Sequence, residues 1–428
     1  MSAIFGSRLP LFLASLSLAL PLSPLLADLP AAIADSPISP AIAENSPIVA
    51  QGTGIRLNGK QFPAAWVQWQ QGASPRIGIS DTAAMQLLGL ELLNTDRPNV
   101  QPSRWFSGTE TEQMTLSARF LSPYRYLDLT DLLQAAGVTV QVNGNSLSLD
   151  FPLSQIANIR AGNQSWGQRL VVDLDRPTAW QVSQAKGEAV VMVAAAASPR
   201  LSVAFTPTSP SSKLRQGDED DLGSGTAINT NSPVFSLENG EGITKIKVNL
   251  PPAGGLRTFS LAKPYRLVID VRPDALGDRR LTWYEGLTWN QRYLRLGESL
   301  FPVNWLEVNL NSPQIALKPI ASNPNGREGI APLVSTARSW HAVAAINGGF
   351  FNRNSKLPLG AIRQDGRWLS GPILNRGAIA WNAQGGVKIG RLSLRETVVA
   401  AGGQRLSASW LNSAYVSEGM ARYTSDWG

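Results

Sequence analysis

The sequence contains no cysteine and only one histidine, His341, among its 428 residues. The absence of cysteine excludes disulfides, thiol nucleophiles, lipid-modified cysteine and zinc sites built on thiolates. A single histidine also excludes zinc sites with paired histidines, and a Ser-His-Asp triad would have to use His341. That residue follows Trp340, and no partner that would orient it is visible in the sequence, so a structural role is favoured.

Charged residues are also scarce, at 16% of the chain, whereas hydrophobic residues make up 43%. This balance excludes a chain that is disordered throughout. The 38 glycines and 29 prolines favour many turns and linkers over long helices. At roughly 100–200 residues per domain, the length leaves room for several domains, each with its own core.

The positive charge is concentrated in the last third of the chain. Residues 276–428 contain 17 Lys and Arg against 9 Asp and Glu, whereas the remaining residues contain 21 against 22. Arginine outnumbers lysine 29 to 9, and its planar guanidinium binds phosphate through two parallel hydrogen bonds. The pattern predicts an anionic ligand, and the alternative is a basic surface that only keeps the protein soluble.

The first 34 residues have the pattern of a signal peptide. Arg8 precedes the apolar stretch Leu9–Ala27, and the small residues of Ala32-Ile33-Ala34 provide a cleavage site. An uncleaved anchor is the alternative, but the stretch contains three prolines and barely reaches spanning length. We therefore predict an exported protein, in the periplasm, in the cell envelope or secreted, with no stable transmembrane segment after cleavage. Export makes nucleic acid an unsuitable partner. Residues 35–53 are predicted to form a linker.

Residues 54–152 contain an internal repeat with an offset of 48 residues. Ile79–Leu92 and Leu127–Val140 each combine a polar N-cap candidate, a short apolar helix, a glycine after it and an alternating strand. Asn143-Gly144, between two alternating runs, predicts a β-hairpin. The pattern resembles the copper amine oxidase N-terminal-like (stalk) domain, which implies a small helix-plus-hairpin module. Copper chemistry is not implied, because no cysteine or nearby histidine is present.

Residues 153–275 contain a second, looser repeat. Gln168–Leu174 (QRLVVDL) and Tyr265–Val271 (YRLVIDV) are each preceded by an alternating strand, and their charged residues are predicted to face water. The Ser-, Pro- and Gly-rich segment 206–233 between the copies is predicted to be a linker. The pattern resembles the AMIN domain, a β-rich module that targets exported proteins to the cell wall. A spacer with no binding role is the alternative.

Four motifs follow in residues 276–428. They are AAINGGFF (Ala344–Phe351), PLGAIRQDGRW (Pro358–Trp368), ILNRGAIAW (Ile373–Trp381) and YTSDWG (Tyr423–Gly428). Ala342–Ile346 is predicted to be a strand that leads into Asn347, and Asp365-Gly366 is predicted to be a hairpin turn.

In these motifs the chain resembles the phosphodiester glycosidase family, the group of the N-acetylglucosamine-1-phosphodiester alpha-N-acetylglucosaminidases. The resemblance implies an α+β domain that hydrolyses the bond between the anomeric carbon of a sugar and a phosphate. In the family, further glycine- and Asp-rich motifs follow the Tyr-Thr-x-x-Trp-Gly motif. We therefore expect residues 276–428 to be the N-terminal portion of a C-terminally truncated domain.

The candidate site residues come from these motifs. Asn347 offers a donor and an acceptor at the predicted strand end, and Asp365 and Glu418 are the candidate catalytic carboxylates. A plain turn residue is the alternative for Asp365, and a solvated charge is the alternative for Glu418 and for Asp426. The candidate substrate-binding residues are Gly348, Gly349, Phe350, Arg363 and Arg376, with Arg376 favoured over Arg363 and Arg367 for phosphate.

The predicted fold class is therefore α+β and multidomain, with a helix-plus-hairpin module, a β-rich module and an α+β glycosidase-like domain. The predicted function is hydrolysis of a sugar phosphodiester in an envelope glycan or exopolysaccharide. The alternative is a non-catalytic envelope protein that binds anionic glycans or peptidoglycan. No cofactor or metal site is predicted, and any metal would be Ca²⁺ or Mg²⁺ on oxygen ligands.

Overall fold

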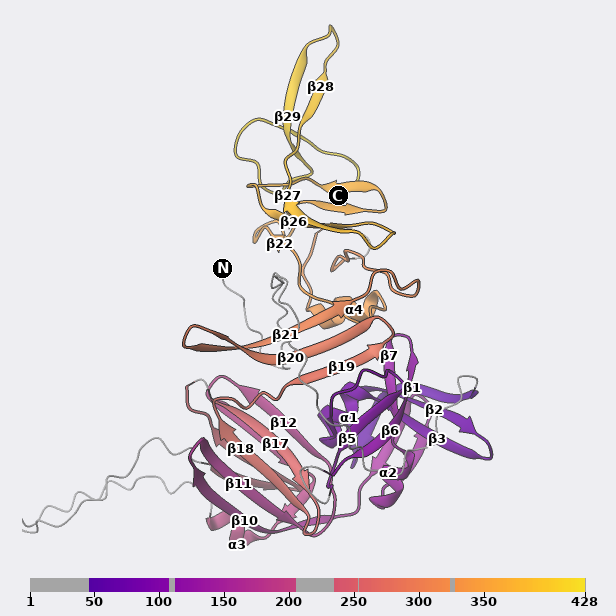
Figure 1. The fold of residues 1–428 in the computed structure, drawn as a ribbon, viewed down its shortest axis with the longest axis vertical. Helices are drawn as coiled ribbons and strands as arrows, with labels where there is room; N and C mark the ends of the chain where they lie inside the picture. The colour runs from indigo at the N-terminus through magenta and orange to yellow at the C-terminus, as the bar shows by residue number, and fades with distance from the viewer. Residues whose placement is uncertain (1–45, 108–111, 205–234, 253, 324–327, 428) are drawn as a thin grey trace, which may run out of the picture. The chain divides into compact units, whose positions relative to one another are not determined.

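The computed structural model of the protein describes residues 46–107, 112–204, 235–252, 254–323 and 328–427 (Figure 1). The predicted signal peptide and the predicted linker 206–233 lie outside these residues. The described chain divides into two compact units. The first comprises residues up to Trp283 together with Trp289–Trp305, and the second comprises Tyr284–Thr288 and Leu306–Gly428.

The predicted α+β class is wrong, because the structure is β-rich, with 54% strand and 7% helix. Isolated helices shorter than about 12 residues are marginal in water, and glycine and proline interrupt the apolar periods before longer helices can form. Each helix of the described chain is short: α1 (Asp81–Leu88), α2 (Thr130–Ala135), α3 (Pro199–Ala204) and α4 (Leu333–Ser339).

A nine-stranded sheet begins the first unit, with the strand order β4-β5-β6-β7-β3-β2-β1-β9-β8. Its first strand in the chain starts at Ile48, so residues 48–53 of the predicted linker 35–53 belong to a strand instead. The strands are β1 (Ile48–Leu57), β2 (Lys60–Gln71), β3 (Ser74–Ser80), β4 (Glu91–Leu92), β5 (Val100–Arg104), β6 (Met114–Leu121), β7 (Tyr124–Asp128), β8 (Thr139–Asn143) and β9 (Ser146–Asp150).

The two copies of the first repeat lie next to each other in this sheet. Strand β3 pairs antiparallel with β7, so that Gly78 faces Asp128. Gly89 and Gly137, which follow α1 and α2, have φ angles of 74° and 70°, the left-handed conformation that glycine adopts without strain. Trp66 and Trp69 on β2 are fully buried and anchor the core of the sheet.

Two further sheets complete most of the first unit, with the orders β14-β10-β11-β18-β17 and β12-β13-β16-β15. Each buries alternate residues, so each has one face packed against another layer. The strands are β10 (Ser154–Gln164), β11 (Gly167–Leu174), β12 (Trp180–Ala185), β13 (Glu188–Val193), β14 (Ala195–Ala197), β15 (Phe235–Gly240), β16 (Ile243–Asn249), β17 (Gly255–Leu261) and β18 (Arg266–Arg272).

The copies of the second repeat also pair with each other, as β11 and β18. Arg169 lies opposite Asp270, and its guanidinium holds the Asp270 carboxylate with N–O distances of 2.7 and 2.8 Å. The prediction that the charged residues of these strands face water is wrong for Asp270, whose side chain is 1% exposed. Burial is tolerated there because the carboxylate is paired with Arg169 on the neighbouring strand.

A three-stranded sheet follows in the chain, formed by β19 (Arg279–Tyr284), β20 (Leu287–Leu296) and β21 (Ser299–Val308). The rings of Trp283 and Trp289 stack nearly parallel, with 6.1 Å between their centroids. Offset stacking of this kind adds to the stability that apolar burial gives the sheet.

The second unit is built from short strands in separate small sheets and from α4. From Leu306 onward, the buried apolar side chains of the described residues are those of Leu369, Ile373, Ala408 and Leu411. The strands are β22 (Phe350–Phe351), β23 (Pro358–Leu359), β24 (Ile362–Gln364), β25 (Arg367–Ser370), β26 (Gly377–Trp381), β27 (Val387–Arg391), β28 (Glu396–Val399), β29 (Arg405–Leu411) and β30 (Met420–Arg422).

Among the described residues, the structure has no helix long and apolar enough to cross a membrane.

Candidate functional site

The Asn-Gly-Gly segment of the second unit is open to solvent. The prediction of a strand over Ala342–Ile346 is wrong, because these residues follow the end of α4 without pairing to a strand. Asn347, Gly348 and Gly349 are all exposed, and a methyl group added to either glycine would meet no atom within 4 Å. A ligand can therefore approach the backbone of this segment closely.

Phe350 and Arg376 are brought together directly after this segment. Phe350 pairs with Leu359 between β22 and β23, and the residue is 61% exposed. The guanidinium carbon of Arg376 lies 4.3 Å from the centroid of that ring, within the range of a cation–π contact. One nitrogen of the guanidinium, Nη1, is buried and has no hydrogen-bond partner among the described residues. An unpaired buried donor is costly.

The turn before Arg376 has an unusual backbone. Leu374 and Asn375 both have φ angles of 49°, and the Arg376 amide donates to the Ile373 carbonyl at 3.1 Å. A left-handed conformation is uncommon for leucine and costs of order 1–3 kcal/mol. The buried Ile373 side chain anchors this turn, which fixes where the Arg376 side chain leaves the backbone.

Arg363 and Asp365 lie in the β24–β25 hairpin, apart from the Arg376–Phe350 contact. Asp365 and Gly366 have φ angles of 50° and 78°, as a two-residue hairpin turn requires. The Arg363 Nε donates to the Gly366 carbonyl at 3.3 Å, and its guanidinium carbon lies 5.7 Å from the Trp368 ring centroid. Asp365 is exposed, and its side chain has no hydrogen bond or ion pair within the described chain. The geometry fits the turn alternative for Asp365.

Glu418 is likewise exposed, and its backbone carbonyl, not its carboxylate, accepts a hydrogen bond. Its carbonyl accepts a hydrogen bond from Trp410 Nε1 at 2.6 Å. The carboxylate of Asp426 pairs with Arg367. Within the part of the chain that the structure describes, neither Glu418 nor Asp365 is linked to Arg376 by a hydrogen bond or ion pair. The candidate carboxylates therefore do not form one contact network with the arginine that is the candidate for binding phosphate.

Sequence reasoning missed Asn412, which ties the last motif to the rest of the unit. Asn412 is fully buried, and its Nδ2 donates to the Leu369 carbonyl at 3.1 Å and to the Thr424 hydroxyl at 2.8 Å. Its Oδ1 accepts from the Thr424 amide at 2.8 Å. The Tyr-Thr-Ser-Asp-Trp-Gly motif therefore has a structural role here through Thr424. No spacing or repeat in the sequence marks Asn412.

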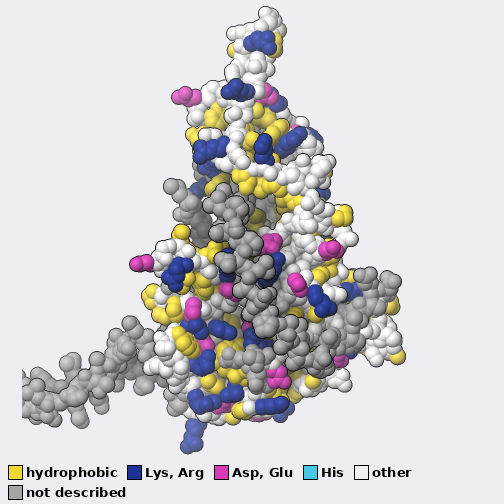
Figure 2. Space-filling view, viewed as in Figure 1, with side chains coloured by type: hydrophobic (Ala, Val, Ile, Leu, Met, Phe, Trp, Pro, Cys, Tyr) yellow, Lys and Arg dark blue, Asp and Glu magenta, His cyan; other side chains and the backbone are white. Residues whose placement is uncertain are grey.

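The charge of the second unit is mostly positive. Figure 2 shows more Lys and Arg than Asp and Glu side chains over the C-terminal strands on the face in view. Glu396 is neutralised by Arg422, which donates two hydrogen bonds of 2.9 and 2.5 Å and holds the pKa of Glu396 below its usual value. Arg376 has no such carboxylate among the described residues, so its charge remains available to an anion.

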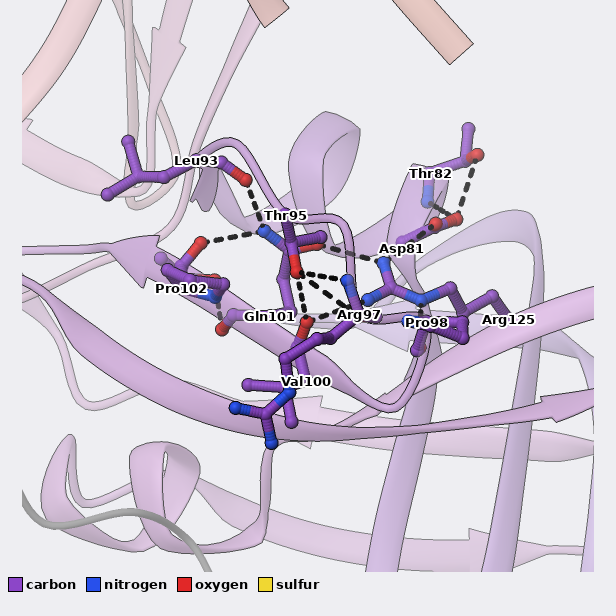
Figure 3. Close-up of polar contacts among 11 residues, drawn as sticks. Asp81, Thr82, Leu93, Thr95, Arg97, Pro98, Val100, Gln101, Pro102 and Arg125 are labelled. Atoms are coloured by element: carbon purple, nitrogen blue, oxygen red, sulfur yellow. Dashed lines mark hydrogen bonds and ion pairs between the residues drawn. The ribbon is translucent and has the colours of Figure 1, made fainter. Parts of the chain in front are cut away.

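A buried polar cluster lies in the first unit, around Arg125 (Figure 3). Arg125 is 3% exposed and donates to the carbonyl of Pro98 at 2.8 Å, to Gln101 Oε1 at 2.9 Å and to the carbonyl of Val100 at 3.3 Å. Its Nη1 lies 3.7 Å from Asp81 Oδ2, too far for a hydrogen bond. Burial raises the pKa of Asp81 and lowers that of Arg125. Through Arg125, the cluster ties β7 to Val100 and Gln101 on β5.

Within the described ranges, no group of three or more Asp, Glu or His side chains is placed to hold a metal ion.

Comparison with known proteins finds a fold relative but no activity. No protein-family model matches the chain, and no curated protein matches it. The chain is similar to a crystal structure of a hypothetical protein from Synechocystis, with 44% sequence identity and a TM-score of 0.76 over 90% of this chain. The chain spans 64% of the length of that protein. This likeness extends to the fold of most of the chain, and the description of the relative states no function.

Proposed function

We propose that the protein is exported to the cell envelope, binds a sugar phosphodiester through its C-terminal unit and hydrolyses the bond between the anomeric carbon and the phosphate. The observation that carries the proposal is Arg376, whose guanidinium lies over Phe350 with one buried, unpartnered nitrogen beside the open Asn-Gly-Gly segment. A guanidinium with no carboxylate partner among the described residues suits a phosphate oxygen, and the exposed Phe350 ring suits the apolar face of a sugar.

The reaction requires water to attack the anomeric carbon while the phosphate leaves with the bonding electron pair. The leaving phosphate monoester is stabilised by Arg376, and the proton of the attacking water passes to a carboxylate. In this proposal Asn347 hydrogen-bonds the sugar. Asp365 and Glu418 remain the candidates for the carboxylate, although neither contacts Arg376 in the described structure.

A non-catalytic anion-binding role is the second candidate. It is favoured by the lack of any hydrogen bond or ion pair between Arg376 and either candidate carboxylate among the described residues. Under this alternative, the protein would bind the same phosphodiester without releasing its sugar.

Binding and turnover of the methyl diester of N-acetylglucosamine 1-phosphate separate these functions. Arg376→Ala should weaken binding by more than about tenfold, equivalent to 1.4 kcal/mol, and Arg376→Lys should restore only part of it. Arg391→Ala, which removes the same charge from the exposed end of β27, is the matched control and should change binding little. Equal losses in the two alanine variants would show that only net charge matters and would refute the site.

Turnover identifies the carboxylate. Asp365→Asn preserves a residue that tolerates the turn conformation, and Glu418→Gln preserves size, so both variants should fold. We expect one of them to reduce sugar release by more than about a hundredfold at unchanged binding. If the wild-type protein binds the diester but releases no sugar, the non-catalytic alternative holds.

A further inference from the structure

A second hollow, in the first unit, has a chemistry unlike that of the Arg376 region. It has a volume of about 550 Å³ and lies over β1, β2 and the β8–β9 turn. Hydroxyl and amide side chains line it together with Phe62 and Pro63, and no charged side chain is among its lining residues. The volume is within the range of about 300–1,000 Å³ typical of small-ligand sites.

A register shift between β1 and β2 borders this hollow, which we call the Thr53 groove. Between the pairs Gly52–Trp66 and Gly54–Pro63, two residues of β2 lie opposite Thr53 alone. Its amide donates to Asn145 Oδ1 at 3.1 Å, and Asn145 Nδ2 donates to its hydroxyl at 3.3 Å. Bulges of this kind re-aim side chains and are frequent beside binding sites.

The amide groups around the bulge retain hydrogen-bonding capacity. Gln61 Oε1 accepts from the Ser146 hydroxyl at 3.3 Å, which leaves the Gln61 amide nitrogen for a ligand. Asn143 is exposed, and its side chain makes no hydrogen bond within the described chain. A side-chain amide presents a donor and an acceptor side by side, the arrangement that matches neighbouring hydroxyls of a sugar ring.

The pairing of β1 prevents a peptide strand from adding to it. β1 is hydrogen-bonded to β2 on one side and to β9 on the other, so it offers no free edge for strand addition. The absence of lysine and arginine from the lining disfavours an anion. Phe62 supplies a half-buried ring, with the Lys60 ammonium 5.4 Å from its centroid on the same strand. Such a ring packs against the C–H face of a sugar.

We infer that the Thr53 groove binds a neutral oligosaccharide, through Gln61 and Asn143 at its rim and Phe62 beside them. This site is distinct from the phosphodiester site proposed at Arg376 and does not depend on it. A protein with both sites would hold an uncharged stretch of a glycan with the first unit and an anionic linkage with the second.

The test uses the whole protein and a panel of immobilised neutral tetrasaccharides based on glucose, mannose, xylose and N-acetylglucosamine. We expect at least one to bind, and the double variant Gln61→Ala/Asn143→Ala to weaken binding at least tenfold. Gln164→Ala, an exposed amide on β10 outside the groove, is the matched control and should bind as the wild type does. Phe62→Leu keeps apolar bulk and should also weaken binding.

Two further arms separate this site from the one at Arg376. Raising NaCl from 0.05 to about 0.5 M should leave binding unchanged, since the ligand is neutral and no charged side chain lines the groove. Arg376→Ala should likewise have no effect. Failure of every neutral tetrasaccharide to bind, equal binding by the double variant and the wild type, or loss of binding in high salt would each overturn the proposal.

Discussion

The buried pair of Arg125 and Asp81 predicts two very different costs for removing its two members. Arg125→Met keeps most of the aliphatic volume but removes the Arg125 donors from the Pro98 carbonyl and from Gln101 Oε1. The Val100 carbonyl also loses Arg125 but still accepts from the Thr95 hydroxyl at 2.9 Å. It also leaves the Asp81 carboxylate without a nearby cation. Breaking a buried pair in this way costs about 3–5 kcal/mol, which lowers Tm by on the order of 10 °C.

Asp81→Asn should cost far less, about 1 kcal/mol or below. The Asp81 Oδ2 has no hydrogen-bond partner, so little is lost there. The other oxygen accepts from the Thr82 amide at 2.7 Å, a bond that an asparagine oxygen can keep. Arg125 retains its three acceptors in this variant, and its own burial is therefore still compensated.

The pH dependence of the Arg125→Met variant provides a check on the cause. Because burial raises the pKa of Asp81 above its value in the unfolded chain, the folded state binds more protons and stability falls as pH rises through that range. Loss of the Arg125 charge raises this pKa further. The Tm deficit of Arg125→Met should therefore be smaller at pH 5 than at pH 7.

Thermal unfolding followed by tryptophan fluorescence measures these differences, since Trp66 and Trp105 are buried in the same unit. Arg160→Met is the control, because Arg160 pairs with Asp173 from a side chain that is 56% exposed. Its Tm should stay close to that of the wild type. Equal losses for Arg125→Met and Asp81→Asn, or a deficit that grows on acidification, would refute this reasoning.

Three further predictions concern stability. Arg76→Ala should cost about 3 kcal/mol, measured by urea unfolding, because it strips the fully buried Asp128 carboxylate of its partner at 2.8 Å. Asp131→Asn should destabilise the folded protein at neutral pH only. The Arg76 hydrogen bonds hold the pKa of Asp131 below its usual value, so their contribution to stability is lost as pH falls through that lowered pKa. Gly89→Ala should cost at least about 3 kcal/mol, since the new Cβ would lie 2.2 Å from Trp180. Gly59→Ala should cost only about 1 kcal/mol of backbone strain, because Gly59 has a φ of 80° and nothing lies within 4 Å of the new Cβ. Similar losses in the two alanine variants would show that the Trp180 contact relaxes without cost.

Local signals in the sequence predicted the short-range structure well. The predicted hairpin joins β8 to β9, but its loop residues are Gly144 and Asn145, because Asn143 pairs with Ser146. The Asp365-Gly366 turn joins β24 to β25 as predicted. The helix before Gly89 ends at the glycine as expected. These features depend on a few consecutive residues whose backbone preferences are strong enough to decide the conformation.

Features that depend on distant partners were not predictable. Ala342–Ile346 is apolar enough for a strand, but small apolar residues fit a coil after a helix equally well when no neighbouring strand pairs with them. The contact between Arg376 and Phe350 joins residues whose separate motifs mark them as binding candidates without showing that they meet. Asn412 escaped notice because its role requires Leu369 and Thr424 to be adjacent in space.

The internal repeats show the same limit in a more specific form. Each second-repeat strand carries an arginine four residues before an aspartate, a pattern that suggests a strand with two charges in water. Because the copies pair antiparallel with each other, Arg169 lies opposite Asp270, and Asp173 lies opposite Arg266. A charge that looks exposed within one copy is thus partnered by the other copy, and Asp270 becomes buried for that reason. Whether a repeat encodes surface or interface depends on which strands become neighbours, which the repeat unit alone does not specify.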